Sequence, residues 1–219
     1  ALARPLPELL TALRGEATVN LAKSQMAGVG LTGEATLRNT AGAQTTALLK
    51  LDAEGNSVRA EGRLGSSGSG AGDVWDLSLD GPALARLAPV FKLFVPPGAD
   101  ATLAGTLTAK TQVKGRWPAL TTTGELDANA LRVGTLGIEK AQARWALGTS
   151  AQAKAEAQAT LTRLSTVRPT GPGPSLESLQ LQLSGTGRAH TLALLAESKA
   201  RPPAWAEQIQ PGAAVVPPQ

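Results

Sequence analysis

The chain has 219 residues, enough for one large domain or two small ones with a sizeable core. Hydrophobic residues make up 42% of it but aromatic residues only 3%, so the side chains available to fill a core are small. The absence of cysteine excludes disulfides and cysteine-ligated metals. The net charge of +4 comes from Lys and Arg scattered singly, without the basic clusters and interleaved aromatic residues of nucleic-acid-binding proteins.

Residues 5–14 (PLPELLTALR) place leucines at helical spacing and predict a short amphipathic helix that ends before Gly15. From there the period changes to two. Apolar and polar residues alternate through four segments up to residue 64, as in half-buried strands. The apolar members are Ala17, Val19, Leu21, Val29, Leu31, Ala35, Leu37, Leu49, Leu51, Ala53, Val58, Ala60 and Leu64.

The next part of the chain predicts a connector, a strand and a helix. Residues 65–72 (GSSGSGAG) have nothing to bury and predict a flexible connector. Residues 73–80 (DVWDLSLD) predict a strand. A helix of one or two turns should start at Pro82, and Pro89 should break or kink it.

Alternation then resumes at Ala101 and continues to Leu147, with one phase change that brings Ile138 into line. Residues 151–161 alternate as well, with alanine at the odd positions up to 159. Alanine also suits a helix, but no apolar stripe of 3.6-residue period is present, so we favour a strand.

The C-terminal part predicts a loop at the Pro/Gly-rich residues 168–175 and a hairpin over 176–198 that turns at 185–187. Residues 201–219 predict a turn of helix and a disordered, Pro-rich tail. The total is ten to thirteen strands.

We therefore expect one elongated all-β domain, a curved, mostly antiparallel meander sheet forming a groove with an apolar interior and one or two short helices. In it, residues 1–72 form the N-terminal strands with their leading helix, 73–200 the main groove region and 201–219 the tail.

Two features that could carry chemistry do not. Gly28, Gly30 and Gly33, followed by Asp52, match the G-x-G-x-x-G pattern of dinucleotide sites, which requires a strand that enters a helix. Here the next residues alternate as a strand, so we predict no cofactor.

His190 is the only histidine, which excludes multi-histidine metal sites, and we expect it on the polar face of a strand. Without a G-x-S-x-G nucleophile motif, we predict no metal site and no enzyme.

About eleven strands spaced about 4.8 Å apart would form a sheet about 50 Å wide, and sheets of that size curl or split into layers. The apolar parity holds both small residues such as Gly124 and Ala155 and large ones that need cover. This mixture fits a long hydrophobic groove with a long apolar guest, or a sandwich of two close sheets. The residues that would line the groove and contact lipid are Val113, Trp117, Leu126, Leu131, Val133, Leu136, Ile138, Trp145 and Leu147.

Residues 105–147 carry a pattern that resembles the repeated element of the TamB family: a Gly-x-Leu strand, a Gly followed closely by Pro, then Leu-x-Gly-x-Leu-x-Ala-x-x-Leu and a further strand. The strand and short helix of residues 75–91 resemble the element that the family places before it. The resemblance spans about residues 73–196 and rests on alternation and turns rather than on a chemical site. The matching positions are Gly105, Leu107, Gly115, Pro118, Gly124, Leu126, Ala128 and Leu131.

TamB-like proteins are anchored in the inner membrane and cross the periplasm as a long curved sheet with an apolar trough. Their C-terminal region partners the outer-membrane protein TamA, and they are linked to autotransporter assembly and to phospholipid movement between the membranes. The resemblance implies a piece of such a chain in the periplasm of a Gram-negative bacterium. No signal peptide and no run of about 20 apolar residues is visible, so the membrane anchor and any contact with TamA should lie outside this sequence.

The favoured hypothesis is a groove that conducts phospholipids, through their acyl chains, between the inner and outer membranes and so supports outer-membrane biogenesis. The alternative is a periplasmic scaffold or chaperone of the translocation and assembly module that binds outer-membrane protein clients at a sheet edge. An inert spacer is a third possibility.

Overall fold

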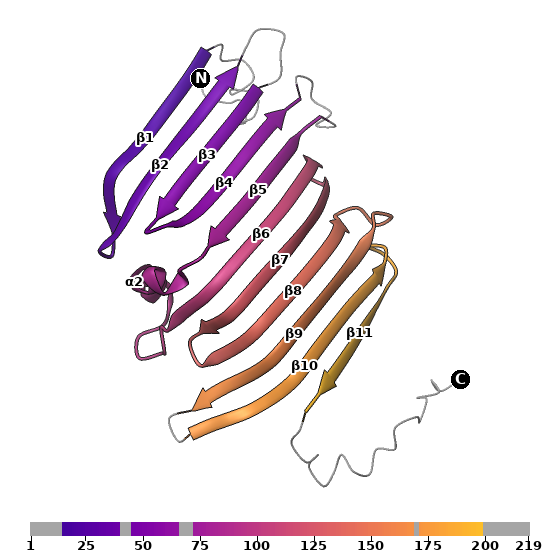
Figure 1. Ribbon diagram of the computed structural model, residues 1–219. Coiled ribbons are helices and arrows are strands. Elements are labelled where there is room, and N and C mark those ends of the chain that lie inside the picture. The colour runs from indigo at the N-terminus through magenta and orange to yellow at the C-terminus, as the bar shows by residue number, and fades with distance from the viewer. Residues whose placement is uncertain (1–14, 40–44, 66–71, 169–170, 199–219) are drawn as a thin grey trace.

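The computed structural model describes residues 15–39, 45–65, 72–168 and 171–198, which form one antiparallel sheet of eleven strands (Figure 1). Each strand pairs with the strands before and after it in the chain, so the sheet is an open, curved meander. The predicted fold class is confirmed. The strands are β1 (Gly15–Met26), β2 (Val29–Asn39), β3 (Thr45–Ala53), β4 (Asn56–Leu64), β5 (Val74–Gly81), β6 (Leu103–Arg116), β7 (Ala119–Val133), β8 (Leu136–Gly148), β9 (Ala155–Arg168), β10 (Gly171–Gly185) and β11 (His190–Glu197).

Tight turns hold neighbouring strands in this order. In the turn between β1 and β2, Ala27 and Gly28 have φ angles of 50° and 82°, and in the turn between β3 and β4, Glu54 and Gly55 have φ angles of 53° and 82°. Two successive residues with positive φ are the signature of two-residue type I′ hairpins, whose twist matches that of the strands. These turns fix the register of the β1–β2 and β3–β4 pairs.

The predicted helix is present between β5 and β6 as three short pieces, η1 (Leu84–Leu87), α2 (Ala88–Phe91) and η2 (Lys92–Phe94). The segment divides where η1 ends at Leu87 and α2 begins at Ala88, and Pro89, expected to break or kink the helix, lies in the first turn of α2. A proline there is tolerated because its missing N–H would have no intrahelical partner.

Two predicted boundaries are wrong. Residues 171–175, predicted as part of a loop, belong to β10, which begins at Gly171, and β9 continues to Arg168. The pairing of these strands shifts between Pro172 and Ser175, and such an irregularity accommodates proline within a sheet. β9 starts at Ala155 rather than at residue 151: residues 155–161 are extended and not helical, as predicted, whereas residues 151–153 form a turn.

Several predictions concern residues outside the described ones. The helix predicted at 5–14, most of the connector at 65–72, and the tail at 201–219 belong to this group. Within the described part, β5 pairs with both β4 and β6, so a single sheet crosses the boundary between residues 1–72 and 73–200. Two separate sheets are absent from the described residues, which makes the sandwich alternative wrong for this part of the chain.

Two tryptophans lie flat on the sheet over cross-strand glycines. Trp75 pairs with Gly62, and Trp145 pairs with Gly124. A Cβ atom added at Gly62 would lie 2.5 Å from the Trp75 ring, and one at Gly124 would lie 2.4 Å from the Trp145 ring. Glycine is therefore required beneath each indole by close approach.

We expect Gly124→Ala to lower the free energy of unfolding by about 1–3 kcal/mol, as overpacking does in other proteins. The added methyl group would meet the Trp145 ring at 2.4 Å and the Lys110 carbonyl oxygen at 2.6 Å, and the backbone atom cannot move aside cheaply. Urea denaturation measures the change. The control is Gly30→Ala, whose added Cβ would meet only the flexible Glu54 carboxylate; equal losses from both changes would contradict the role of the indole contact.

Candidate functional site

One face of the sheet carries an unbroken row of apolar residues that crosses all eleven strands. Directly paired residues on neighbouring strands point to the same side of a sheet, so the register defines this row. We call it the transverse row, and the side of the sheet that bears it the apolar face. From β1 to β11 the transverse row consists of Leu21, Gly33, Leu51, Val58, Leu79, Ala109, Leu126, Ala143, Ala159, Leu181 and Leu194.

The opposite face carries polar and charged residues at the alternate positions. Lys110, for example, pairs with Glu125, and Glu125 pairs with Arg144. Exposed ion pairs such as Arg38–Glu16, at 2.9 Å, join neighbouring strands on this face. Such pairs contribute little stability individually, and the register places both Arg38 and Glu16 on the polar face.

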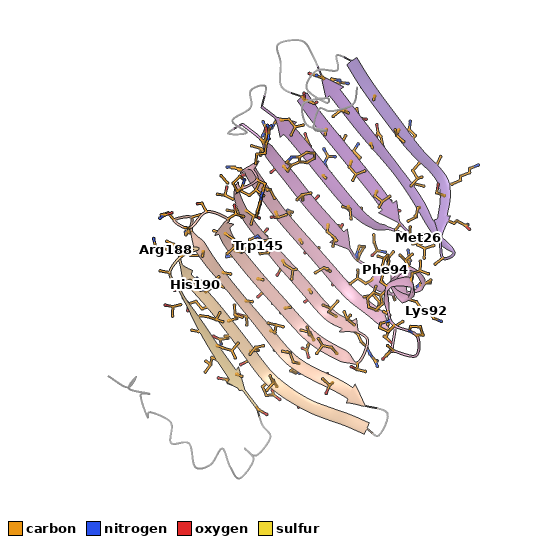
Figure 2. All side chains as sticks on the ribbon, turned by 180° about the vertical axis from the view of Figure 1, so that it is seen from behind. Met26, Lys92, Phe94, Trp145, Arg188 and His190 are labelled. Carbon is orange, nitrogen blue, oxygen red and sulfur yellow. The ribbon has the colours of Figure 1, made fainter. Side chains whose placement is uncertain are left out.

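The apolar face has no second layer of strands over it (Figures 1 and 2). Leu192 and Leu194 of β11 are 60% and 62% exposed, and Val19 of β1 is 67% exposed. No large side chain among the described residues is fully buried. Contiguous exposed apolar surface is characteristic of binding sites, so this face is the candidate functional site. The described hydrophobic residues that are buried are mainly small: Val29, Ala60, Leu84, Ala128, Ala141 and Ala155.

The structure brings eight of the nine predicted groove-lining residues onto the apolar face. Four of them, in β6 to β8, lie on the transverse row or up to four residues from it along the same strand, and the other four form the cross-strand pairs Leu131–Ile138 and Val133–Leu136. The first four are Val113, Leu126, Trp145 and Leu147. Trp117 is different: it lies in the turn between β6 and β7, beyond the end of the paired strands, and is 74% exposed.

The expected phase change is a local irregularity in the strands. Ala130 has a φ angle of 48°, and the pairing of β6 with β7 shifts beside it, so β7 holds one extra residue. A bulge of this kind reverses the alternation of the side chains that follow. Leu131 and Ile138 therefore stay on the apolar face although their parity differs from that of the neighbouring residues.

Three polar side chains on the apolar face, Thr111, Thr122 and Trp145, are joined by hydrogen bonds. Trp145 Nε1 donates a hydrogen bond to Thr122 Oγ1 at 3.3 Å, and the Oγ1 atoms of Thr122 and Thr111 are 3.0 Å apart. Thr111 Oγ1 donates to the Thr123 carbonyl oxygen at 3.1 Å, so its single hydrogen is used and Thr122 must be the donor in the pair. Each of these three donors has an acceptor within the protein, and an apolar guest would leave none of them unpaired.

Other arrangements of reactive groups do not form a site. Within residues 15–39, 45–65, 72–168 and 171–198, no group of three His, Asp or Glu residues could hold a metal ion. His190 pairs with Gly185 and has the parity of Leu192, so the prediction that it lies on the polar face is wrong. The turn before β11 sets its phase, which alternation counted from Ala189 could not show.

The glycine motif has no dinucleotide-site context. Gly28 lies in the turn before β2, Gly30 and Gly33 lie within β2, and β3 follows rather than a helix. Shallow hollows of about 250–420 Å³ do occur, each outlined mainly by polar-face side chains. One is bordered by Lys110, Gln112, Thr123, Glu125 and Arg144 together with neighbouring backbone.

None of the helices in the described part of the chain is both long and apolar enough to span a membrane. Comparison of the chain with protein-family models, with curated proteins and with solved structures found no match.

Thr122→Val should lower the free energy of unfolding by about 1 kcal/mol, because it removes the acceptor of the Trp145 indole N–H while keeping the side-chain shape. Thermal or urea denaturation measures the loss. Thr121→Val is the matched control, since Thr121 is exposed on the polar face of the same strand. If both variants have the stability of the parent chain, the hydroxyl chain contributes nothing.

Proposed function

We propose that this chain is part of a TamB-like protein of the Gram-negative periplasm and that its apolar face is a groove that conducts phospholipids between the inner and outer membranes. The transverse row is the observation that supports the proposal. It extends along the long dimension of the sheet for about 50 Å, given eleven strands about 4.8 Å apart. No charged residue interrupts it. Along such a path an acyl chain stays in contact with apolar side chains at every step.

The energetics suit a passive conduit. Each buried CH₂ group gains about 0.8 kcal/mol, wherever along the chain it lies, so affinity depends on chain length and not on a specific bond. The closed hydroxyl chain of Thr111 and Thr122 offers an acyl chain no unpaired donor. Binding should therefore be insensitive to the lipid head group. The membrane anchor and any contact with TamA would belong to other parts of the parent protein.

Photo-crosslinking tests this function. A photoreactive residue placed at Val113 or Leu126, on the apolar face, should capture phospholipid, because acyl chains would lie within reach of the probe. Probes at the neighbouring polar-face positions Gln112 and Glu125 are the matched controls and should capture little. Mass spectrometry of the purified protein should also detect bound lipid. Equal labelling at all four positions, with no bound lipid, would contradict the proposal.

A second candidate function is supported by strand β11. It lies at an edge of the described sheet, and all of its residues are exposed. Charged residues, prolines and bulges usually protect an edge strand from pairing with another strand. Residues 191–196 of β11 contain none of these. An unfolded outer-membrane protein strand could pair with it by β-augmentation, as a scaffold for client assembly would require.

A proline in β11, at a position whose N–H points away from β10, distinguishes the two functions. It should abolish pairing with a client strand, because proline has no N–H to donate. Lipid capture at Leu126 should remain. Pull-down with an unfolded outer-membrane protein measures client binding, and the crosslinking assay measures lipid capture. Client binding that survives the proline would argue against β11 as the docking edge.

A further inference from the structure

The helical segment between β5 and β6 ends in two adjacent apolar side chains that face solvent. Leu93 and Phe94, in η2, are 62% and 76% exposed, whereas Leu84, at the start of the segment, is 7% exposed. We call Leu93 and Phe94 the tip. Figure 2 shows Phe94 and Lys92 together on the side of the sheet where the strands end, the same side that bears Met26 next to the β1–β2 turn.

The segment that carries the tip is attached firmly to the sheet. The Asn56 side chain accepts a hydrogen bond from the Ala83 N–H at 3.1 Å and donates one to the Ala83 carbonyl oxygen at 3.2 Å. Arg86 Nη1 donates to the Glu54 carbonyl oxygen at 3.0 Å. Leu84 packs over Gly81, where an added Cβ would come within 2.8 Å of it. These contacts hold the base of the segment against the turn between β3 and β4, so the exposure of the tip is a property of the fold.

The charges of the segment have one sign. Between Gly81 and Ala99 the charged residues are Arg86 and Lys92, and there is no acidic residue. Lys92 precedes the tip directly. Apolar side chains next to cations, on a short helix at the protein surface, are typical of elements that insert shallowly into an anionic bilayer.

We propose that the tip docks this side of the sheet on an anionic phospholipid bilayer. The inference goes beyond the proposed function: the tip lies at the strand ends between β5 and β6, so docking would bring that side of the apolar face to the bilayer, and not β1 or β11, where the transverse row ends. A bilayer suits two isolated apolar side chains because it requires no complementary shape. A stable protein partner would instead need about 1,200 Å² of buried surface or more, far beyond what the tip offers.

The test uses the absence of cysteine from the chain, which makes single-site labelling unambiguous. Phe94→Cys carries the environment-sensitive fluorophore NBD, and Trp117→Cys with the same label is the matched control. Trp117 is 74% exposed and follows the other end of β6. With phosphatidylglycerol vesicles the emission of the label at 94 should rise in intensity and shift to shorter wavelength, and both changes should be several-fold larger than for the label at 117. With phosphatidylcholine vesicles its response should be weaker.

Two further variants separate the contributions. Lys92→Gln in the Phe94→Cys background should weaken the apparent affinity for phosphatidylglycerol vesicles about fivefold, the effect of one cation near an anionic surface. Leu93→Ser should weaken the response to both vesicle types. Both residues are exposed, so neither change should alter the circular dichroism spectrum.

The outcomes also separate this inference from the proposed function. Equal responses at positions 94 and 117, or no response at either, would overturn docking through the tip even if crosslinking at Leu126 still captures lipid. A response confined to position 94 would support docking whether or not lipid is captured on the apolar face. Absence of lipid capture on the apolar face would overturn the conduit and leave the docking inference standing.

Discussion

The whole structure depends on the matching polarity of directly paired residues from one edge of the sheet to the other. Leu126 lies between Ala109 and Ala143, while Glu125, one residue away, lies between Lys110 and Arg144. A slip of one residue between β7 and β8 would place Leu126 opposite Arg144 and would break the apolar face. Tight turns with positive φ at Ala27–Gly28 and Glu54–Gly55 oppose such slips in the N-terminal strands. Register is therefore the property on which any use of the apolar face as a path depends.

The small residues on the apolar face have a role that their size alone does not reveal. Alanine and glycine stand beside the large side chains in the cross-strand pairs, as Gly124 does under Trp145 and Ala143 does beside Leu126. A large side chain can then lie along the sheet instead of standing up from it. The result is a low, continuous surface that has no need to interlock with a second layer. This explains why a chain with few aromatic residues can present a long apolar path.

The irregularity at Ala130 has a counterpart two strands away. Arg163 in β9 also has a φ angle of 48°, and Glu139 of β8, which lies between them in the sheet, forms an ion pair with Arg163. A non-glycine residue in this conformation costs about 1–2 kcal/mol. In return the alternation changes phase together in β7, β8 and β9, so Leu131, Ile138 and Leu164 remain aligned across three strands.

Alternation in the sequence determined the strands, the all-β class and eight of the nine residues expected on the apolar face, because side-chain parity is a local consequence of extended backbone. The spacing of apolar residues after Pro82 determined the short helix. Tertiary structure decided the rest. Trp117 has the right parity but lies beyond the end of β6, and the parity of His190 depends on the turn before β11. Whether the apolar face meets a second layer depends on which strands pair, and pairing joins residues far apart in the chain. Local periodicity is the same in a sandwich and in an open sheet, so only the pairing of all eleven strands in one sheet could separate them.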